Sequence, residues 1–415
     1  MIKINTSKFS VFLLAISFLF CPRDFPISGL HSYRLVLMLI LLLNIKKIRI
    51  DKKLFNIFTV LYILYISLSY FWGDGITSFA GFVIDTAGLI LSIYVTLDSN
   101  RKVKLFAKYL CYCAIIYSIL CVAESLTGFS IFNIITGIGL SKKRYGFYRA
   151  RGVANHSINN GLILAILVCM LLYFKEENLF AKKKLNIAII LSSIACIFTF
   201  SRTPLIALIL VFFLYFVKQG GLKYLIKHKN TVLLCAIISF SAVIASSTLR
   251  GFLQNFFDMF LAVFDDSVAD SITSSFGSNA NGIGERFDLY KWVYQDMGDN
   301  HIFGVGANTA FAHAFQMTKK TVRIKTSIEN QYLKYFYYFG YVGLSIFVLY
   351  VLKNMIYAIM RIRKNSIYAY AFISMITLAV CWFFVSSVDD FRWFVLFTSL
   401  MYIIPKIERG GMEVW

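Results

Sequence analysis

Arg202 gives the clearest chemical signal in the sequence, because it lies in a short polar turn between two apolar runs. The turn at residues 201–204 separates the apolar residues 185–200 from residues 205–217. A permanent cation at membrane depth costs about 3 kcal/mol on insertion scales, so it usually has a partner or a task. Pro204 fits the first turn of a following helix, whose free N–H groups favour an anion. The turn predicts a phosphate site, with an arginine that only marks the membrane interface as the alternative.

A loop just before the apolar run at 158–174 interleaves cations with aromatic rings. Guanidinium groups pair with oxyanions, and flat rings stack on sugar faces, so the pattern suits a ligand that contains both sugar and phosphate. A basic and aromatic belt at the membrane surface is the alternative interpretation. The residues predicted to bind substrate in and after this loop are Arg144, Arg149, Arg151, Asn155 and His156.

The long polar segment 249–327 contains a stretch, residues 284–297, in which apolar residues recur at helical spacing. We expect a helix there that lies on the membrane surface, with Arg286 in its first turn. A cation is unfavourable at a helix N-terminus unless an anion is bound nearby. Arg286 is therefore a second candidate phosphate ligand, and Arg323 and Lys325 are expected to guide the same ligand.

A carboxylate, Glu329, stands at the start of a late apolar run. If Ser327 caps the helix, Glu329 lies in its first turn, where a negative charge stabilises the helix by about 0.3–1 kcal/mol. The same carboxylate could instead act as a general base, while nearby arginines hold an anionic leaving group. Asn330 and Tyr332, which follow Glu329, are further predicted substrate contacts.

The elements that must position these residues are apolar helices. The 415 residues are 59% hydrophobic with a mean hydropathy of +0.70, which excludes a soluble domain. The predicted fold is an all-α polytopic membrane protein with about 12 transmembrane helices and one large outer loop that contains short helices. The expected spans are about 9–22, 34–45, 54–72, 79–97, 103–126, 158–174, 185–200, 204–217, 231–248, 328–352, 367–386 and 391–405.

The basic residues predict which way the chain lies in the membrane. Most of the 42 lysines and arginines fall at the ends of alternate spans, which places both termini in the cytoplasm by the positive-inside rule. Residues 1–248 then hold spans one to nine with a basic outer loop at about 127–157. Residues 249–327 form the large outer loop, and residues 328–415 hold the last three spans and a cytoplasmic tail. The candidate site lies on the outer side of the membrane.

Charge and cysteine content exclude several other classes of protein. The formal charge of +21 does not indicate nucleic-acid binding, because the basic residues cluster at span ends. The eight cysteines fall within or at the edges of apolar runs, without the spacing of a disulfide framework or a zinc site. Neither a metal site nor a cofactor site is predicted.

These stretches resemble the bacterial O-antigen polymerase and O-antigen ligase superfamily of inner-membrane glycosyltransferases. The resemblance rests on residues 201–208, on residues 286–308, on residues 329–344 and on Gly152 to Asn155. It implies a twelve-helix, metal-independent enzyme that acts on sugar chains linked to undecaprenyl pyrophosphate at the periplasmic face. It also implies that Arg202 and Arg286 contact the pyrophosphate of the donor.

The same resemblance bears on which reaction is catalysed. Ligases of this superfamily typically have a His-Asn pair where this chain has Glu329-Asn330, whereas the polymerases vary there and often have an acidic residue. We therefore expect a polymerase of lipid-linked repeat units, with Glu329, Arg202 and Arg286 as catalytic residues. A ligase that transfers glycan to the lipid A core is the nearest alternative, and a transporter or flippase is a more distant one. The expected partners are the lipid-linked oligosaccharide, membrane lipids and a protein that controls chain length.

Overall fold

The computed structural model describes most of the chain, and the predicted span at 231–248 lies outside the described part. The boundary predicted at residue 248 is also outside it, so the division into three parts stays a prediction. The residues that the structure describes are 6–21, 26–27, 30–132, 143–144, 147–154, 156–221, 283–307, 309–318, 321–386 and 389–410.

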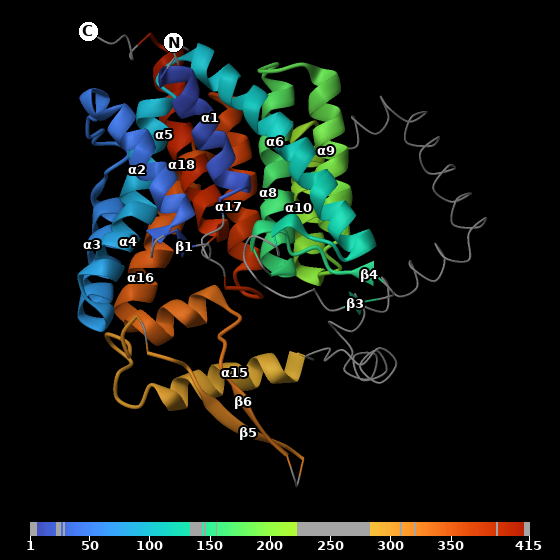
Figure 1. Ribbon diagram of the computed structural model, residues 1–415. Helices are drawn as coiled ribbons and strands as arrows, with labels where there is room; N and C mark the ends of the chain where they lie inside the picture. Colours follow the sequence, from blue (N-terminus) through green and yellow to red (C-terminus); the bar gives the residue numbers. More distant parts are fainter. Residues whose placement is uncertain are drawn as a thin grey trace, which may run out of the picture.

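Long helices make up most of the described structure and pack side by side into a bundle (Figure 1). They are α1 (Thr6–Leu19), α2 (Ser32–Leu43), α3 (Ile57–Asp74), α4 (Ile76–Val83), α5 (Leu89–Thr96), α6 (Asn100–Thr127), α8 (Ser157–Glu176), α9 (Lys182–Ile197), α10 (Arg202–Lys218), α15 (Ile283–Asp296), α16 (Gln331–Ile359), α17 (Ser366–Cys381) and α18 (Asp389–Glu408).

The remaining elements are short. They are the turns η1 (Ile45–Lys47), η2 (Ile84–Gly88) and η3 (Gly152–Ala154), and the antiparallel hairpins β1 (Pro26–Ile27) with β2 (Leu30–His31), β3 (Lys143–Arg144) with β4 (Phe147–Tyr148), and β5 (His313–Thr318) with β6 (Thr321–Lys325).

Each predicted span that falls on described residues overlaps a helix, so the positions of the apolar elements are confirmed. Shorter apolar helices, such as Thr6–Leu19 and Ser366–Cys381, pack beside the helices that are long and apolar enough to cross a membrane. The chain is a mostly helical membrane protein, and the number of its helices that cross the bilayer stays a prediction. The long apolar elements are Ile76–Thr96, Asn100–Thr127, Ser157–Glu176 and Gln331–Ile359.

Helix α8 forms the centre of the bundle, because all of its side chains from Asn160 to Phe174 are buried. It packs against α9, α10 and α17. Gly161 allows α10 to come close: a β-carbon at residue 161 would lie 2.5 Å from the Cβ of Pro204. Small residues at such crossings let membrane helices pack tightly. This contact fixes the beginning of α10, where Arg202 lies.

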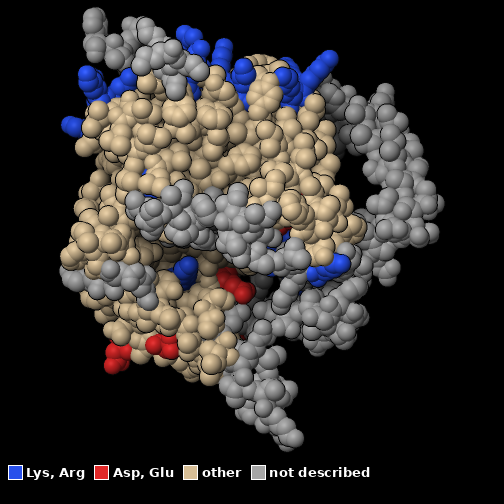
Figure 2. All heavy atoms as spheres, viewed as in Figure 1, with Lys and Arg blue, Asp and Glu red and all other residues tan. Residues whose placement is uncertain are grey.

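One end of the bundle is strongly basic. Figure 2 shows lysine and arginine side chains gathered at the end where α1 begins and α18 ends in Figure 1. Some of these cations form ion pairs, including Lys102 with Asp98 at 2.6 Å and Lys406 with Asp51 at 3.0 Å. The basic clusters that the sequence assigns to one side of the membrane therefore do lie at one end of the protein.

At the opposite end, α15 and the β5–β6 hairpin form a layer below the bundle (Figure 1). The helix predicted at 284–297 is confirmed, but its apolar face does not lie on a membrane surface. Leu289, Val293 and Met297 are buried against Leu333 and other residues of α16. The β5–β6 hairpin was not predicted either, so the large loop contains more than short helices. This layer is fixed to α16, the helix that follows Glu329.

Helix α16 is interrupted at Gly340, where φ is 64° and ψ is −166°. A broken helix leaves backbone groups without helical partners, and at membrane depth such groups must be satisfied by other protein groups. The loop at 301–306 supplies these partners. The hydrogen bonds join Val305 N to Tyr337 O at 3.0 Å, Gly306 N to Tyr338 O at 3.1 Å, Tyr341 N to His301 O at 2.9 Å and Val342 N to Ile302 O at 3.2 Å.

We expect Gly340→Ala to destabilise the protein by roughly 2–6 kcal/mol, the sum of a conformation open almost only to glycine and a steric clash. A β-carbon at residue 340 would lie 2.2 Å from the Ile302 carbonyl oxygen. Gly75 is a matched control, because it has nearly the same backbone angles, φ 81° and ψ −164°, with nothing within 4 Å of the added carbon. The thermal midpoint of the detergent-solubilised protein should fall clearly further for Gly340→Ala than for Gly75→Ala. If the thermal midpoints of the two variants fall equally, the contact with the 301–306 loop does not contribute to stability.

Candidate active site at the loop end of the bundle

The segment 149–154 is held in place by buried polar groups of two helices. The Glu124 carboxylate on α6 accepts hydrogen bonds from the backbone N–H groups of Arg151 at 3.2 Å and Gly152 at 3.0 Å. Asn160 on α8 donates to the Ala150 carbonyl at 3.2 Å and accepts from the Tyr117 hydroxyl at 2.5 Å. A satisfied buried network of this kind is rigid. The backbone that presents Arg149 and Arg151 is therefore fixed from beneath.

Arg149 joins this segment to the turn before α10. Its guanidinium group donates to the Thr199 carbonyl at 3.3 Å and to the Ser201 hydroxyl at 2.6 Å. Between these two partners, Phe200 has a φ of 48°, a conformation that is uncommon for a bulky residue. The Phe147 ring stacks on Phe200 with a centroid distance of 5.7 Å. Such strain persists only where the surrounding contacts hold it, and it is often found at functional sites.

Arg202 is the first residue of α10 and is half-buried. The sequence prediction that this helix starts at the turn, with Pro204 in its first turn, is confirmed. Ser201 occupies the N-cap position, but its side chain bonds to Arg149 and does not cap a helix N–H. Two arginines, 149 and 202, therefore meet at the N-terminus of one helix, an arrangement that favours an anion.

The start of α16 differs from the prediction. Asn330, not Ser327, is the N-cap, and its side-chain oxygen accepts from Leu333 N at 2.9 Å. Glu329 therefore precedes the helix and is exposed, instead of lying in the first turn. The Asn330 side-chain amide also donates to the Tyr290 hydroxyl at 2.7 Å, which ties α15 to α16.

The chain segments that carry Arg202 and Glu329 both contact the C-terminal end of α17. The Cys381 thiol contacts the Thr203 carbonyl at 3.9 Å, and Gln331 N donates to the Trp382 carbonyl at 2.8 Å. Cys381 and Trp382 are adjacent, so the residues after Arg202 and after Glu329 lie on the same helix end. Tyr332, a predicted substrate contact, also points toward α17 and donates its hydroxyl to the Ala379 carbonyl at 2.9 Å.

The pKa of His156 is affected by charged residues of two segments, the one at 149–154 and the one that contains Glu329. Burial by the surrounding protein lowers the pKa of His156 below its ordinary value of 6.5, and the positive charges of Arg149 and Arg151 lower it further. The negative charge of Glu329 acts in the opposite direction. Glu329, Arg149 and Arg151 are therefore all close enough to influence the His156 imidazole. The residue as a whole still has exposed surface, so the protein packs around the imidazole without enclosing His156 completely.

A pH dependence of stability follows from His156. Because its pKa is lower in the folded protein than in the unfolded chain, the unfolded state binds more protons between the two values. The stability that the neutral form of His156 contributes to the folded protein is fully present above pH 6.5. It is lost as the pH falls through the pKa of His156 in the folded protein. We expect His156→Gln to reduce the acid-induced fall in thermal midpoint without changing the midpoint at pH 7.5. Identical pH profiles for the two proteins would contradict this assignment.

The other predicted site residues are placed only in part. Arg286 lies in α15, one helical turn before Tyr290, the residue that bonds to Asn330. Arg144 lies in β3, and Arg323 and Lys325 lie in β6. The side chains of these four residues, and Asn155 as a whole, lie outside the described part of the structure. Figure 2 shows a hollow between the bundle and the loop layer, with basic and acidic side chains at its edge.

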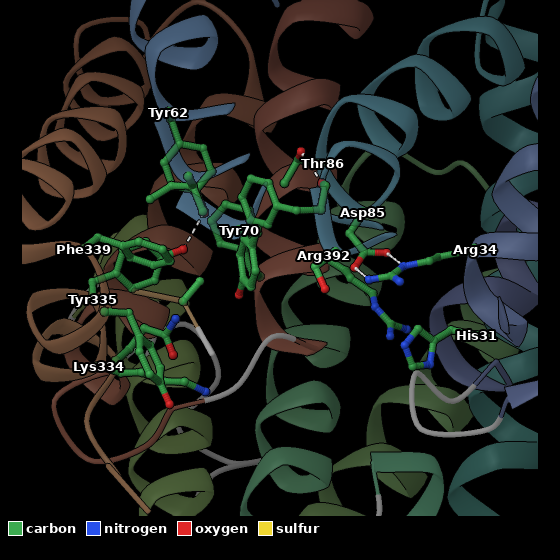
Figure 3. A pocket seen from close by; sticks show the side chains of 17 residues that line it. His31, Arg34, Tyr62, Tyr70, Asp85, Thr86, Lys334, Tyr335, Phe339 and Arg392 are labelled. Carbon is green, nitrogen blue, oxygen red and sulfur yellow. Dashed lines mark hydrogen bonds and ion pairs between the residues drawn. The ribbon is translucent and has the colours of Figure 1, made fainter. Parts of the chain in front are cut away.

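A second site within the bundle was not predicted. Arg34 forms a two-pronged ion pair with Asp85, with distances of 2.9 Å and 2.7 Å, in a cavity that also receives Lys334 and Arg392 (Figure 3). Asp85 is a charge in the interior of an apolar run, and such a residue is a functional-site hypothesis by default. That signal was present in the sequence, but the arginine that pairs with Asp85 is 51 residues away and could not be identified.

Comparison with known families bears on the first of these sites. The family model described as O-antigen ligase matches residues 187–348, which run from α9 to the middle of α16 and include Arg202, Arg286 and Glu329. No curated protein matches the chain. The match confirms the resemblance predicted from the sequence and supports an enzyme of the membrane glycosyltransferase type. The chain is thus a helical membrane protein whose residues 187–348 match the O-antigen ligase family model, in agreement with the predicted resemblance to the O-antigen polymerase and ligase superfamily.

Proposed function

We propose that the chain is an O-antigen polymerase, which joins repeat units linked to undecaprenyl pyrophosphate and releases undecaprenyl pyrophosphate. The observation that supports this most strongly is that segments carrying a carboxylate and several arginines converge at one end of the bundle. The charges of Glu329, Arg149 and Arg151 all affect His156, and the residues that follow Arg202 and Glu329 contact the same end of α17. Glycosyl transfer from a lipid diphosphate needs both kinds of group.

In the proposed reaction, the Glu329 carboxylate takes the proton of a sugar hydroxyl on the acceptor. The hydroxyl oxygen forms a bond to the anomeric carbon of the donor glycan, and the bond from that carbon to the diphosphate oxygen breaks. The electron pair leaves with the diphosphate, whose charge Arg202 and Arg286 stabilise. Arginine suits this task because its planar donors match phosphate oxygens in pairs. The proton on Glu329 then passes to water.

The substrate-binding roles extend to the surrounding segments. Arg149 and Arg151 are held on a rigid support, so they are suited to orient the glycan and its diphosphate. Asn330 orients α15, and with it the backbone of Arg286, relative to Glu329. The remaining predicted contacts, among them Arg144, Asn155, Arg323 and Lys325, stay predictions. The same holds for a metal-independent reaction and for a protein partner that sets chain length.

The charge distribution supports one orientation in the membrane. The basic end of the bundle would face the cytoplasm, together with both termini, by the positive-inside rule. The end with Arg202 and Glu329 would then face the periplasm of the inner membrane. We also keep the proposal of about 12 transmembrane helices, because the helices found match the expected spans.

Deletion of the gene separates the two members of the superfamily. Loss of a polymerase leaves single repeat units on the lipid A core, whereas loss of a ligase leaves the core bare. The ligase is the second candidate because the matching family model is described as an O-antigen ligase. Glu329-Asn330 in place of His-Asn favours the polymerase, so we expect single repeats on the core. A bare core would establish the ligase instead.

A further inference from the structure

The cavity within the bundle has the size and lining of a ligand site. Its volume is about 370 Å³, within the range usual for small-molecule sites. Its walls come from α2, α3, α4 with η2, α16 and α18. Ala307 and Gln331 also line it, so the cavity extends to the loop end of the bundle, two residues from Glu329. The segments around Arg202, from β4 to α10, do not contribute to the described lining.

Cations outnumber carboxylates among the described residues that line this cavity. Arg34, Lys334 and Arg392 carry positive charge, and Asp85 is the one carboxylate in this described set. Figure 3 shows Arg34 and Arg392 on one side and Lys334 on the other. The Arg34 and Asp85 side chains compensate each other as an ion pair and are only 14% and 11% exposed. Lys334 and Arg392 add positive charge beside this pair, so the charge of the described lining is positive overall and favours an anionic ligand.

The backbone around the cavity is irregular in two places. Asp85 lies in η2, a single turn of π-helix inserted between α4 and α5, and such turns are frequent at functional sites. The interruption of α16 at Gly340 directly follows Phe339, which lines the cavity. At membrane depth, irregular backbone is tolerated where it is buried in protein or lines a cavity that holds polar groups. Both irregular stretches of backbone therefore lie beside the same cavity.

Gly81 of α4 makes room for the Arg34 guanidinium group. A β-carbon at residue 81 would lie 2.4 Å from Arg34 Nη1 and 2.5 Å from Arg34 Cζ. Alanine is otherwise the better helix former by about 1 kcal/mol, so a glycine here is unfavourable for the helix itself. The guanidinium group is thus held between the α4 backbone and Asp85, with its position fixed on two sides.

We propose that this cavity binds the diphosphate of a second lipid-linked glycan, the acceptor of the polymerisation. The inference rests on the proposed function, because a polymerase must hold two lipid diphosphates at once. The donor diphosphate leaves beside Arg202 and Glu329. The acceptor reacts through a hydroxyl at the far end of its repeat unit, so its own diphosphate needs a separate site. Arginine and lysine around the cavity suit a diphosphate, and Tyr70, Tyr338 and Phe339 provide faces for the attached sugar.

The test is to titrate the purified full chain in detergent with farnesyl diphosphate and measure heat of binding and stoichiometry. We expect two equivalents for the wild type. Gly81→Ala, which displaces Arg34, and Lys334→Gln should each weaken one equivalent about 10- to 100-fold. Gly88→Ala is the matched control, because its added carbon meets its nearest neighbour at an ordinary 3.5 Å, so both equivalents should remain. Arg202→Ala should weaken the other equivalent.

Each alternative result has a defined meaning. A single equivalent in the wild type, or two equivalents that both survive Gly81→Ala and Lys334→Gln, overturns the second site and leaves the polymerase intact. Competition experiments identify which anionic lipid the cavity prefers. If phosphatidylglycerol displaces the bound ligand as readily as farnesyl diphosphate does, the assignment to a lipid diphosphate is overturned. If both sites bind but the purified chain elongates no glycan, the proposed function fails while the cavity site stands. Displacement by inorganic diphosphate supports recognition of the diphosphate group itself.

Discussion

Cells that carry Arg202→Ala in place of the wild type are expected to make surface glycans with single repeat units and no long chains. Removing one donor that stabilises charge in the transition state typically lowers the rate by about 10²- to 10³-fold. Arg202 lies at the N-terminus of α10 beside Arg149, so its loss removes a cation where the leaving diphosphate is proposed to bind. The measurement is the length distribution of the glycan on gels.

Arg361→Ala provides the control for this experiment. Arg361 is also half-buried, and its guanidinium group stacks on the Tyr357 ring at 3.8 Å, but it lies just after α16, away from Glu329. Chain length should be unchanged in this variant. Long chains in Arg202→Ala cells that have normal protein levels would remove the arginine from the mechanism. Loss of long chains in both variants would indicate that the assay responds to instability alone.

Glu329→Gln is expected to have an effect of similar or larger size, about 10²- to 10⁴-fold on the rate, because a general base contributes this much. The substitution keeps the shape of the side chain and removes its ability to accept a proton. Since Glu329 is exposed and precedes the helix, the change should alter the free energy of unfolding by less than about 0.5 kcal/mol. The thermal midpoint should therefore stay close to that of the wild type.

A second variant at the same position separates a base from a purely electrostatic role. Glu329→His keeps a group that can accept a proton and is expected to retain part of the activity. A carboxylate needed only for its negative charge would make the histidine variant as inactive as the glutamine variant. Full activity of Glu329→Gln would exclude this residue as the base, and His156, which lies within its electrostatic reach, would become the candidate.

The sequence predicted the helices well because membrane spans are coded locally. A run of apolar residues has few alternatives in a bilayer, so the expected spans overlap helices wherever the structure describes them. The start of α10 at Arg202 was also predictable, since Pro204 fits only the first turn of a helix. The start of α16 was not, because Ser327 and Asn330 are both good caps and only tertiary contacts select Asn330.

The site required information that a single sequence does not contain. Nothing local indicates that the segments of Arg202 and Glu329 would both contact the end of α17, or that Arg34 would pair with Asp85 across 51 residues. The apolar face of α15 shows the same limit. Its helical spacing was correct, but spacing alone does not distinguish a face against a membrane from a face against α16.

The most direct test of the central claim is a reconstitution of the purified chain in liposomes with repeat units linked to undecaprenyl pyrophosphate as the only glycan. We expect a ladder of products that differ by one repeat unit, with one undecaprenyl pyrophosphate released for each linkage formed, and no ladder with Glu329→Gln. Transfer that occurs only after lipid A core is added, with no ladder in its absence, would contradict the assignment as a polymerase.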